Sequence, residues 1–375
     1  MSNTPWKSAH AAAVLQGAAA VILLAVGAWQ GIEAIASPQG QQRLRPNLNL
    51  EAFLSGRLTG AVNHVMAHQL PADPLLRAAG GVFRYSLFHS GGPQVRVGCD
   101  DTLFLTEELR PWPQAEAAMA ERAEAMRRVR DALATRGIQL AVAIVPDKAR
   151  VKTDKLCGAP LSAQAAARHD AFLAALRDQR IEPILLLPAL SAQEARGGAY
   201  WRTDTHWNQD GAKAAAAAIA EALRDAPLSR AEEYRTIAAP EETNGPGDLL
   251  RLTSLDRVPD ALRPAPDRQH LEHTEAPESG GGGLLDETPA PEVALVGSSY
   301  SVNANFHGAL QEALRSTVLN AATAGGGFAG SAATYFAGET FHESPPKLVI
   351  WEIPERVVAQ PLTQAERDFI ARWQG

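Results

Sequence analysis

The 375-residue sequence has few of the features on which metal centres, nucleotide sites and nucleic-acid interfaces depend. It holds two cysteines without a Cys-x-x-Cys pair, and its ten histidines form no His-Glu-x-x-His motif, so no metal site is predicted. It has no basic run, and its formal net charge of −7 argues against a nucleic-acid-binding protein. No glycine-rich loop with a lysine is available to bind phosphates, and no cofactor is expected.

The two cysteines, Cys99 and Cys157, leave two interpretations open. A small, even number in an exported protein permits one disulfide. Two buried free thiols fit the sequence equally well.

Charged residues are absent from the N-terminal run 11–29, AAAVLQGAAAVILLAVGAW. A helix of this length spans roughly the hydrocarbon core of a bilayer. The run is interpreted as an uncleaved signal anchor or as a secretory signal cut after Ala36, where Ala34-Ile35-Ala36 is a suitable site. The length of the apolar run favours the anchor. We expect the remaining chain to lie outside the cytoplasm, because everything after residue 40 resembles one soluble unit.

The pattern along the chain predicts three parts: an anchor over 1–36, a helical tether and hairpin over 37–110, and a catalytic domain over 111–375. Within the second part, residues 75–88 predict a helix broken by Gly80-Gly81, and residues 95–105 predict a hairpin around Asp100-Asp101.

Helices and strands are predicted to alternate in the third part, which indicates a three-layer α/β/α sandwich with a mainly parallel sheet. Apolar runs typical of buried strands occupy 138–145, 184–187, 293–296, 317–320 and 348–353, and helical patterns occupy 115–135, 163–179 and 211–223. The segment 263–291 is dense in Pro, Gly and Glu, with four glycines at 280–283, and predicts a long surface loop.

Two short segments carry a carboxylate, an imidazole and a hydroxyl: Asp204-Thr-His206 and Gly297-Ser-Ser299. A serine hydroxyl is a weak nucleophile that needs a base, and the base needs an acid to fix its tautomer. We therefore predict that the two segments meet in space and carry out acyl chemistry. Arg202 and Trp207 belong to the polar and aromatic cluster that surrounds the first segment and are predicted to line the pocket.

The sequence offers several candidates for the groups that donate hydrogen bonds to the oxyanion. The Ser299 N–H is the first candidate, because the serine follows directly on a predicted strand. A glycine N–H in the turn 325–327, from Gly326 or Gly327, is the second candidate. Tyr300 and Asn303 are further candidates, with simple packing behind the nucleophile as the alternative for Tyr300.

Several motifs together resemble the SGNH hydrolase-like domain of the AlgJ and AlgX alginate O-acetylation family. The resemblance covers roughly residues 75–360, and the motifs occur in the family's order: 84–88, 103–108, 200–208 with Gly211, 247–249, 297–301 and 350–356. SGNH hydrolases commonly supply an asparagine from a later strand, but here that strand ends Trp351-Glu-Ile-Pro354 without one.

The resemblance implies a circularly permuted SGNH fold and periplasmic acetyl transfer to an exopolysaccharide, alginate-like or cellulose-like. Ser299 would then be the nucleophile, His206 the general base and Asp204 its orienting acid. It also implies a membrane-bound O-acyltransferase as acetyl donor and an inner-membrane location with the catalytic domain in the periplasm. The chain has no room for the carbohydrate-binding module of AlgX and so looks closer to AlgJ.

The acceptor and the reaction remain open at this stage. A polyanionic acceptor would need a basic groove, for which Arg202, Arg251 and Arg257 are candidates. An exported carbohydrate acetylesterase shares every step with the transferase except the choice of acceptor. A non-catalytic scaffold of an acetylation complex is the third interpretation.

Overall fold

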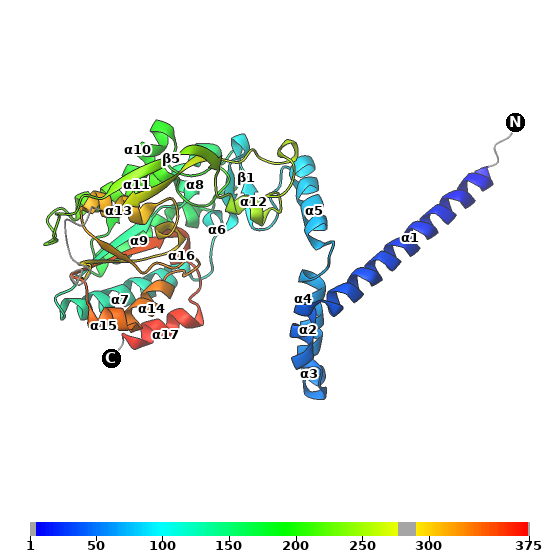
Figure 1. Ribbon diagram of the computed structural model, residues 1–375, viewed down its shortest axis with the longest axis horizontal. Coiled ribbons are helices and arrows are strands. Elements are labelled where there is room, and N and C mark those ends of the chain that lie inside the picture. Colours follow the sequence, from blue (N-terminus) through cyan, green and yellow to red (C-terminus); the bar gives the residue numbers. More distant parts are fainter. Residues whose placement is uncertain (1–4, 277–289, 374–375) are drawn as a thin grey trace. The chain divides into compact units, whose positions relative to one another are not determined.

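The computed structural model describes residues 5–276 and 290–373. The chain divides into two compact units, Met1–Phe83 and Arg84–Gly375 (Figure 1). The predicted hairpin therefore belongs to the unit that holds the sheet, and not to the N-terminal tether.

The first unit begins with a long apolar helix, α1 (Pro5–Ala36). Within the described residues, one helix is long and apolar enough to cross a membrane, over Ala11–Ala36, with a mean hydropathy of 2.1. Its large apolar side chains are exposed; Leu15 and Leu24, for example, are 76% and 74% exposed. A helix whose large apolar side chains are exposed along most of its length is compatible with a single-pass anchor.

Short helices follow α1: α2 (Pro38–Leu44), the 3-10 turn η1 (Arg45–Asn47), α3 (Leu50–Leu54), α4 (Arg57–His68) and α5 (Asp73–Phe88), which continues into the second unit. Ala34 at the end of α1 forms a small core with Leu44 of α2 and with Ala61 and Val65 of α4. The predicted break at Gly80-Gly81 is wrong, because α5 is continuous. Each glycine costs a helix only about 1 kcal/mol relative to alanine, which the surrounding helical hydrogen bonds outweigh.

The second unit is built on a five-stranded parallel sheet in the order β4-β3-β9-β7-β8. The strands are β3 (Gln139–Val145), β4 (Ile184–Leu185), β7 (Val293–Val296), β8 (Val318–Asn320) and β9 (Leu348–Pro354). All residues of β7 and β9 are buried, as predicted for the apolar run of β7 and for the mainly apolar β9, which also holds the carboxylate of Glu352. Because the strands are parallel, their carboxyl ends share one edge, where sites form in such sheets.

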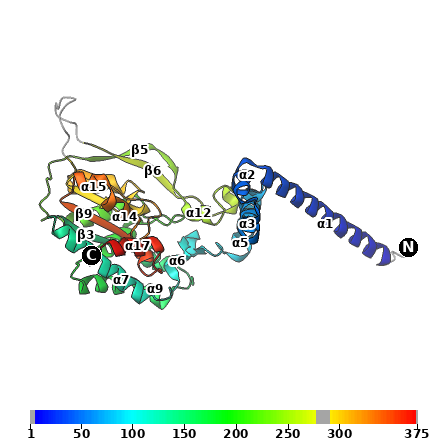
Figure 2. The same cartoon turned by 90° about the horizontal axis from the view of Figure 1, so that it is seen from below.

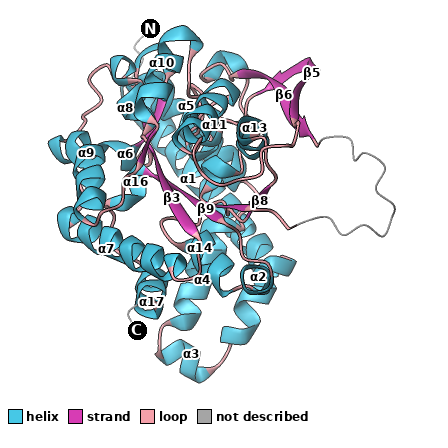
Figure 3. Ribbon diagram, turned by 90° about the vertical axis from the view of Figure 1, so that its left-hand side faces the viewer, coloured by secondary structure: helices cyan, strands magenta, loops and turns pink. Residues whose placement is uncertain are grey.

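Helices cover both faces of this sheet and confirm the predicted three-layer sandwich (Figure 3). One face packs on α7 (Ala115–Ala134), α9 (Ala163–Asp178), α14 (Gly330–Ala337), α15 (Glu339–Glu343), α16 (Glu355–Val358) and α17 (Gln364–Arg372). The other face packs on α10 (Leu187–Gly197), α11 (Gln209–Ala222) and α13 (Phe306–Leu314). Short elements at the carboxyl edge are α6 (Thr106–Leu109), α8 (Lys148–Val151), η3 (Thr153–Lys155), α12 (Asp248–Leu252), η4 (Asp260–Leu262) and η5 (Ser299–Ser301).

The predicted hairpin is present as β1 (Val95–Val97) and β2 (Leu103–Leu105), joined through the 3-10 turn η2 (Cys99–Asp101). Cys99 forms a disulfide with Cys157, so the structure favours the first of the two interpretations of the cysteines. The bond joins the hairpin turn to the segment that follows η3.

An antiparallel ribbon of β5 (Arg235–Asn244) and β6 (Arg268–Glu275) lies beside the sandwich (Figure 2). The expected long loop over 263–291 is therefore wrong for β6, while its glycine run 280–283 lies outside the described residues. The ribbon has little apolar burial, because most of its side chains are partly or fully exposed. This explains why a search for buried apolar strands missed it.

Candidate active site

Ser299 lies on a tight turn that begins where β7 ends. The turn is capped by Ser298, whose side chain accepts a hydrogen bond of 3.2 Å from the Tyr300 N–H. Ser298 and Ser301 are buried, whereas Ser299 is partly exposed. Of the three serine side chains in this turn, that of Ser299 is therefore the one accessible to a substrate.

Asp204 and His206 lie in the loop between α10 and α11. The loop is closed at its base by hydrogen bonds between Asn208 N–H and Ala199 O (2.9 Å) and between Trp201 N–H and His206 O (3.2 Å). The loop closed in this way places Asp204 and His206 at the carboxyl edge of the sheet, next to Ser299.

The structure brings the three predicted catalytic residues together. The distance between His206 Nε2 and Ser299 Oγ is 2.7 Å, and that between His206 Nδ1 and Asp204 Oδ1 is 2.6 Å. With Nδ1 protonated and donating to the carboxylate, Nε2 is the acceptor that faces the serine hydroxyl. The geometry is that of a nucleophile, a base and an orienting acid in a line.

The Asp204 carboxylate is held in its ionised form. Burial alone would raise its pKa, but hydrogen bonds from the His206 ring and the N–H groups of His206 and Asp248 outweigh burial and lower the pKa to about 2. A permanent negative charge beside Nδ1 stabilises the imidazolium that forms when Nε2 takes a proton.

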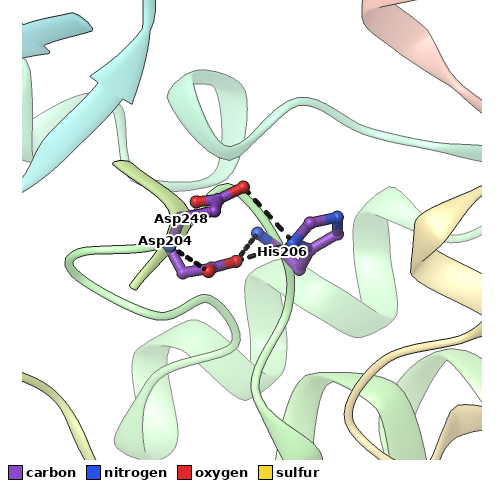
Figure 4. Close-up of side chains that lie close together, drawn as sticks. All are labelled: Asp204, His206 and Asp248. Atoms are coloured by element: carbon purple, nitrogen blue, oxygen red, sulfur yellow. Dashed lines mark hydrogen bonds and ion pairs between the residues drawn. The ribbon is translucent and has the colours of Figure 1, made fainter. Parts of the chain in front are cut away.

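Asp248, at the start of α12, adds a second carboxylate that the sequence interpretation left without a role (Figure 4). Its Oδ1 accepts from the Thr205 N–H at 2.7 Å, and its Oδ2 lies 3.7 Å from His206 Nδ1. Burial and the nearby charge of Asp204 raise the pKa of Asp248. The motif Gly247-Asp-Leu249 was the available signal, but only the fold reveals its neighbour.

Ligand atoms of Asp204, His206 and Asp248 lie within 4.8 Å of one another, a spacing at which a metal ion can be held. However, His206 Nδ1 already donates to Asp204, and the other Asp204 oxygen accepts from the Asp248 N–H at 2.6 Å. These atoms satisfy each other, so the cluster fits a hydrogen-bonded relay better than a metal site.

Lys148 lies beneath the same loop and is fully buried. Its Nζ donates to the carbonyl oxygens of Leu103 (2.6 Å), Arg202 (2.8 Å) and Asp204 (2.9 Å). Burial lowers its pKa to about 8. Through these hydrogen bonds, the lysine joins the hairpin strand β2 to the loop that carries Asp204. No sequence motif predicted this role.

Two aromatic residues near the site pack behind the imidazole. Tyr300 is 1% exposed, donates from its hydroxyl to Thr205 O at 3.0 Å, and meets the His206 ring edge-on at 4.9 Å. Trp207 is fully buried, 5.0 Å from the Tyr300 ring. Tyr300 therefore packs behind the imidazole, as the alternative interpretation expected, and its hydroxyl is not an oxyanion donor. Trp207 does not face an open pocket.

The Ser299 N–H forms no hydrogen bond within the described part of the chain, so it remains available to an oxyanion. The turn with Gly326 and Gly327 lies next to it, because the Thr323 N–H donates to Gly297 O at 3.1 Å. The Gly326 N–H is already used, donating to Thr323 O, so the expectation for Gly326 is wrong and Gly327 is left as the glycine candidate.

Asn303 follows the nucleophile turn, and its N–H donates to Ser299 O at 3.0 Å. This bond fixes the backbone after the serine. It uses the Asn303 N–H, which is therefore unavailable to an oxyanion.

Arg202 supports the loop and does not form an open anion site. Its guanidinium donates to the carbonyl oxygens of Asp100 and Ala265, and its N–H donates to Asp267 Oδ1 at 3.0 Å. Of the other basic candidates, Arg251 donates to Pro246 O, and the Arg257 side chain is 87% exposed.

The family described as "SGNH hydrolase-like domain, acetyltransferase AlgX" matches residues 95–355 of this chain. Its sandwich and the site at its edge define the chain as an SGNH hydrolase-like acetyltransferase. The chain belongs to this family, and the expected class of enzyme, an O-acetyltransferase, is confirmed.

Relatives are of two kinds. The chain is 34% identical to "Probable alginate O-acetylase AlgJ" of Pseudomonas putida over 362 residues, 94% of this chain and 90% of that one. It is also 34% identical to the protein of that name in Pseudomonas aeruginosa, over 85% of both chains. The match to "Alginate biosynthesis protein AlgX" of Pseudomonas aeruginosa is 32% over 76% of this chain and 60% of that one.

The solved structures also show a greater similarity to AlgJ than to AlgX. The O-acetyltransferase domain of Pseudomonas putida AlgJ is 35% identical, with a TM-score of 0.66 over 75% of this chain and 98% of that chain. Pseudomonas aeruginosa AlgX is 26% identical, with a TM-score of 0.57 over 76% and 68%. The predicted similarity to AlgJ in particular is confirmed.

Proposed function

We propose that this protein transfers acetyl groups to an alginate-like exopolysaccharide in the periplasm, through an acetyl-enzyme on Ser299. The observation that carries the proposal is the 2.7 Å contact between Ser299 Oγ and His206 Nε2, with Asp204 bonded to the other ring nitrogen. The names of the relatives, alginate O-acetylase and alginate biosynthesis protein, support the choice of acceptor.

In the first half-reaction, His206 Nε2 takes the proton of Ser299 Oγ as the oxygen attacks the acetyl carbonyl of the donor. The tetrahedral intermediate then collapses, the bond to the donor's leaving group breaks, and the imidazolium gives its proton to that group. Asp204 stabilises the positive imidazole between the two steps. The product is an acetyl ester on Ser299.

In the second half-reaction, a sugar hydroxyl gives its proton to His206 Nε2 and attacks the acetyl-Ser299 carbonyl. Ser299 Oγ leaves and regains a proton from the imidazolium. Water in place of the sugar would give hydrolysis, so the two reactions differ only in the acceptor.

The charge on the carbonyl oxygen needs donors in both half-reactions. The unpaired Ser299 N–H is the donor best supported by the structure, and the Gly327 N–H is the candidate for a second. A single such donor contributes typically about 3 kcal/mol to the transition state.

The apolar helix α1 supports the proposed donor and location. We assign the acetyl supply to a membrane-bound O-acyltransferase, because a single helix cannot carry an acetyl group across a membrane. An anchor at Ala11–Ala36 would keep the catalytic unit close to that partner. Among the basic candidates, the exposed Arg257 is available for a polyuronate, whereas Arg202 and Arg251 donate to backbone carbonyl oxygens.

The test combines the purified protein, an activated acetyl ester and oligouronates, and weighs the glycan by mass spectrometry. We expect acetylated glycan with wild type and a loss of at least about 1000-fold for Ser299→Ala. The control is Ser316→Ala, a buried serine just before β8, at the opposite edge of the sheet from the site.

Two outcomes would replace the proposal. Hydrolysis of the ester at a rate that the glycan does not change would favour the acetylesterase. A Ser299→Ala variant that still supports full acetylation of the polymer in cells would leave the scaffold.

A further inference from the structure

A buried carboxylate, Glu352, lies directly beneath the turn that carries Ser299. It belongs to β9, which pairs with β7 so that Trp351 lies opposite Val296 and Glu352 comes level with Gly297. Glu352 is 1% exposed. It occupies the strand where SGNH hydrolases commonly carry an asparagine, and the mechanism above gives it no role.

Within the described residues, every hydrogen bond of the Glu352 carboxylate goes to this turn. Oε2 accepts from the Ser298 N–H at 2.7 Å and from Ser301 Oγ at 2.9 Å, and the Ser298 hydroxyl lies 3.0 Å from both oxygens. The carboxylate thus holds the residue before Ser299 and the residue two places after it. The Ser299 side chain is not bound by this carboxylate and contacts His206 Nε2 instead.

Gly297 confirms how closely the carboxylate and the turn approach each other. A Cβ at this position would lie 2.5 Å from Ser301 Oγ and 2.6 Å from Glu352 Oε2. Such distances are far inside van der Waals contact, so only glycine admits the carboxylate under the turn.

Burial of this carboxylate is costly, and no basic side chain within the described residues comes close enough to form a direct ion pair with it. Burial raises the pKa of Glu352, while the hydrogen bonds from Ser298 and Ser301 and the nearby charge of Arg356 oppose that rise. A buried carboxylate without a direct ion pair is a poor way to stabilise a core. Its three donors instead point to a local task, that of fixing the turn.

We propose that Glu352 is a positioning residue: by binding Ser298 and Ser301 it keeps Ser299 Oγ in reach of His206 and leaves the Ser299 N–H free for the oxyanion. The inference rests on the proposed function, in which Ser299 is the nucleophile. Displacement of a reacting atom by about 1 Å can cost on the order of 100-fold in rate.

The test measures how fast Ser299 reacts with phenylmethylsulfonyl fluoride, a probe that sulfonylates activated serines with release of fluoride and needs neither donor nor glycan. Rates are expressed per folded molecule, with the folded fraction taken from the same sample by circular dichroism. We expect Glu352→Gln to slow the reaction by about 10- to 100-fold. A merely structural role would lower the folded fraction and leave the rate of the folded molecules unchanged.

The matched control is Glu366→Gln. Glu366 is also a buried glutamate, 7% exposed, but it pairs with Arg122 and caps α17. We expect this variant to lose stability while its folded molecules react at the wild-type rate.

A second variant, Ser301→Ala, keeps the carboxylate and removes one of its donors. We expect a smaller loss, about three- to tenfold, against an unchanged rate for Ser316→Ala. This pair keeps the test valid if Glu352→Gln does not fold.

The outcomes separate the inference from the proposed function. Rates for Glu352→Gln and Ser301→Ala within twofold of wild type would overturn the role of Glu352. A wild-type protein that reacts no faster than Ser299→Ala would instead overturn the nucleophile, and the proposed function with it.

Discussion

Asp204 is the residue on which the electrostatics of the site depend, because its carboxylate accepts three hydrogen bonds in a buried position. Asp248 lies beside it in a partly buried position, and the pKa values of the two carboxyl groups shift in opposite directions. The difference arises because Asp204 receives donors from the imidazole and two N–H groups, whereas Asp248 meets the negative charge of Asp204. Two neighbouring carboxylates therefore have different states and different tasks.

We expect Asp204→Asn to lower the free energy of unfolding by about 2 kcal/mol at pH 7. The pKa of Asp204 is lower in the folded state, so its stabilisation is present above the ordinary value near 4 and is lost as the pH falls towards 2. The difference between wild type and variant, measured by urea unfolding, is expected to shrink across that range.

Asp248→Asn is the control, and we expect it to change the free energy of unfolding in the opposite direction, raising it at neutral pH. Its pKa is raised in the folded state, so the ionised form costs stability at neutral pH and the amide relieves that cost. An Asp204→Asn variant as stable as wild type at pH 7 would contradict this account of the two carboxylates.

Sequence patterns predicted the residues whose chemistry is intrinsic and missed those whose role depends on distant partners. Asp204, His206 and Ser299 were predicted because their side chains form a recognisable reactive set. Lys148 and Glu352 were not, because a lysine after one strand and a glutamate in another acquire a role only through contacts across the fold. Spacing along the chain does not encode those contacts.

At the scale of elements, the loop between α10 and α11 is held from several sides. Lys148 binds two of its carbonyl oxygens from below, and Asp267, just before β6, accepts from the N–H groups of Arg202 and Thr203. The loop has little regular structure of its own, so these contacts replace the hydrogen bonds of a helix or strand.

We expect Lys148→Met to lower the free energy of unfolding by about 3 kcal/mol or more, because three buried carbonyl oxygens lose their donor. Chemical unfolding measures the loss, and the acetyl-transfer rate is expected to fall with it. Lys213→Met is the matched control: Lys213 is 43% exposed and pairs with Glu272, so its loss is expected to cost less than about 1 kcal/mol. Equal stability of the two variants would rule out the proposed role of Lys148.

The elements that the sequence predicted are those with a clear apolar period. β3 and β7 are continuous apolar runs, and α7 and α11 have helical spacing, so their bounds were predicted to within a few residues. The ribbon of β5 and β6 was missed because its strands pair mainly with each other and bury few side chains.

At the scale of the whole molecule, the chain consists of a helical N-terminal unit, which begins with the apolar helix α1, and a second unit with its own two-sided core. All residues of the site described above belong to Arg84–Gly375. No residue of that site comes from Met1–Phe83.

We expect a variant that lacks residues 1–36 to move from the membrane fraction to the soluble fraction and to keep its reaction with the sulfonyl fluoride. Fractionation after an alkaline carbonate wash measures the first effect, and the probe measures the second. If the protein produced from the full-length gene is instead found in the soluble fraction and begins at Ser37, the segment is a cleaved signal and not an anchor.

The supports of the loop that carries Asp204 and His206 come from remote parts of the sequence, among them Leu103, Lys148 and Asp267. A saturation screen for lost acetylation would consequently return hits dispersed over most of the gene. Projected onto the fold, the same hits would collapse into one compact shell around the imidazole.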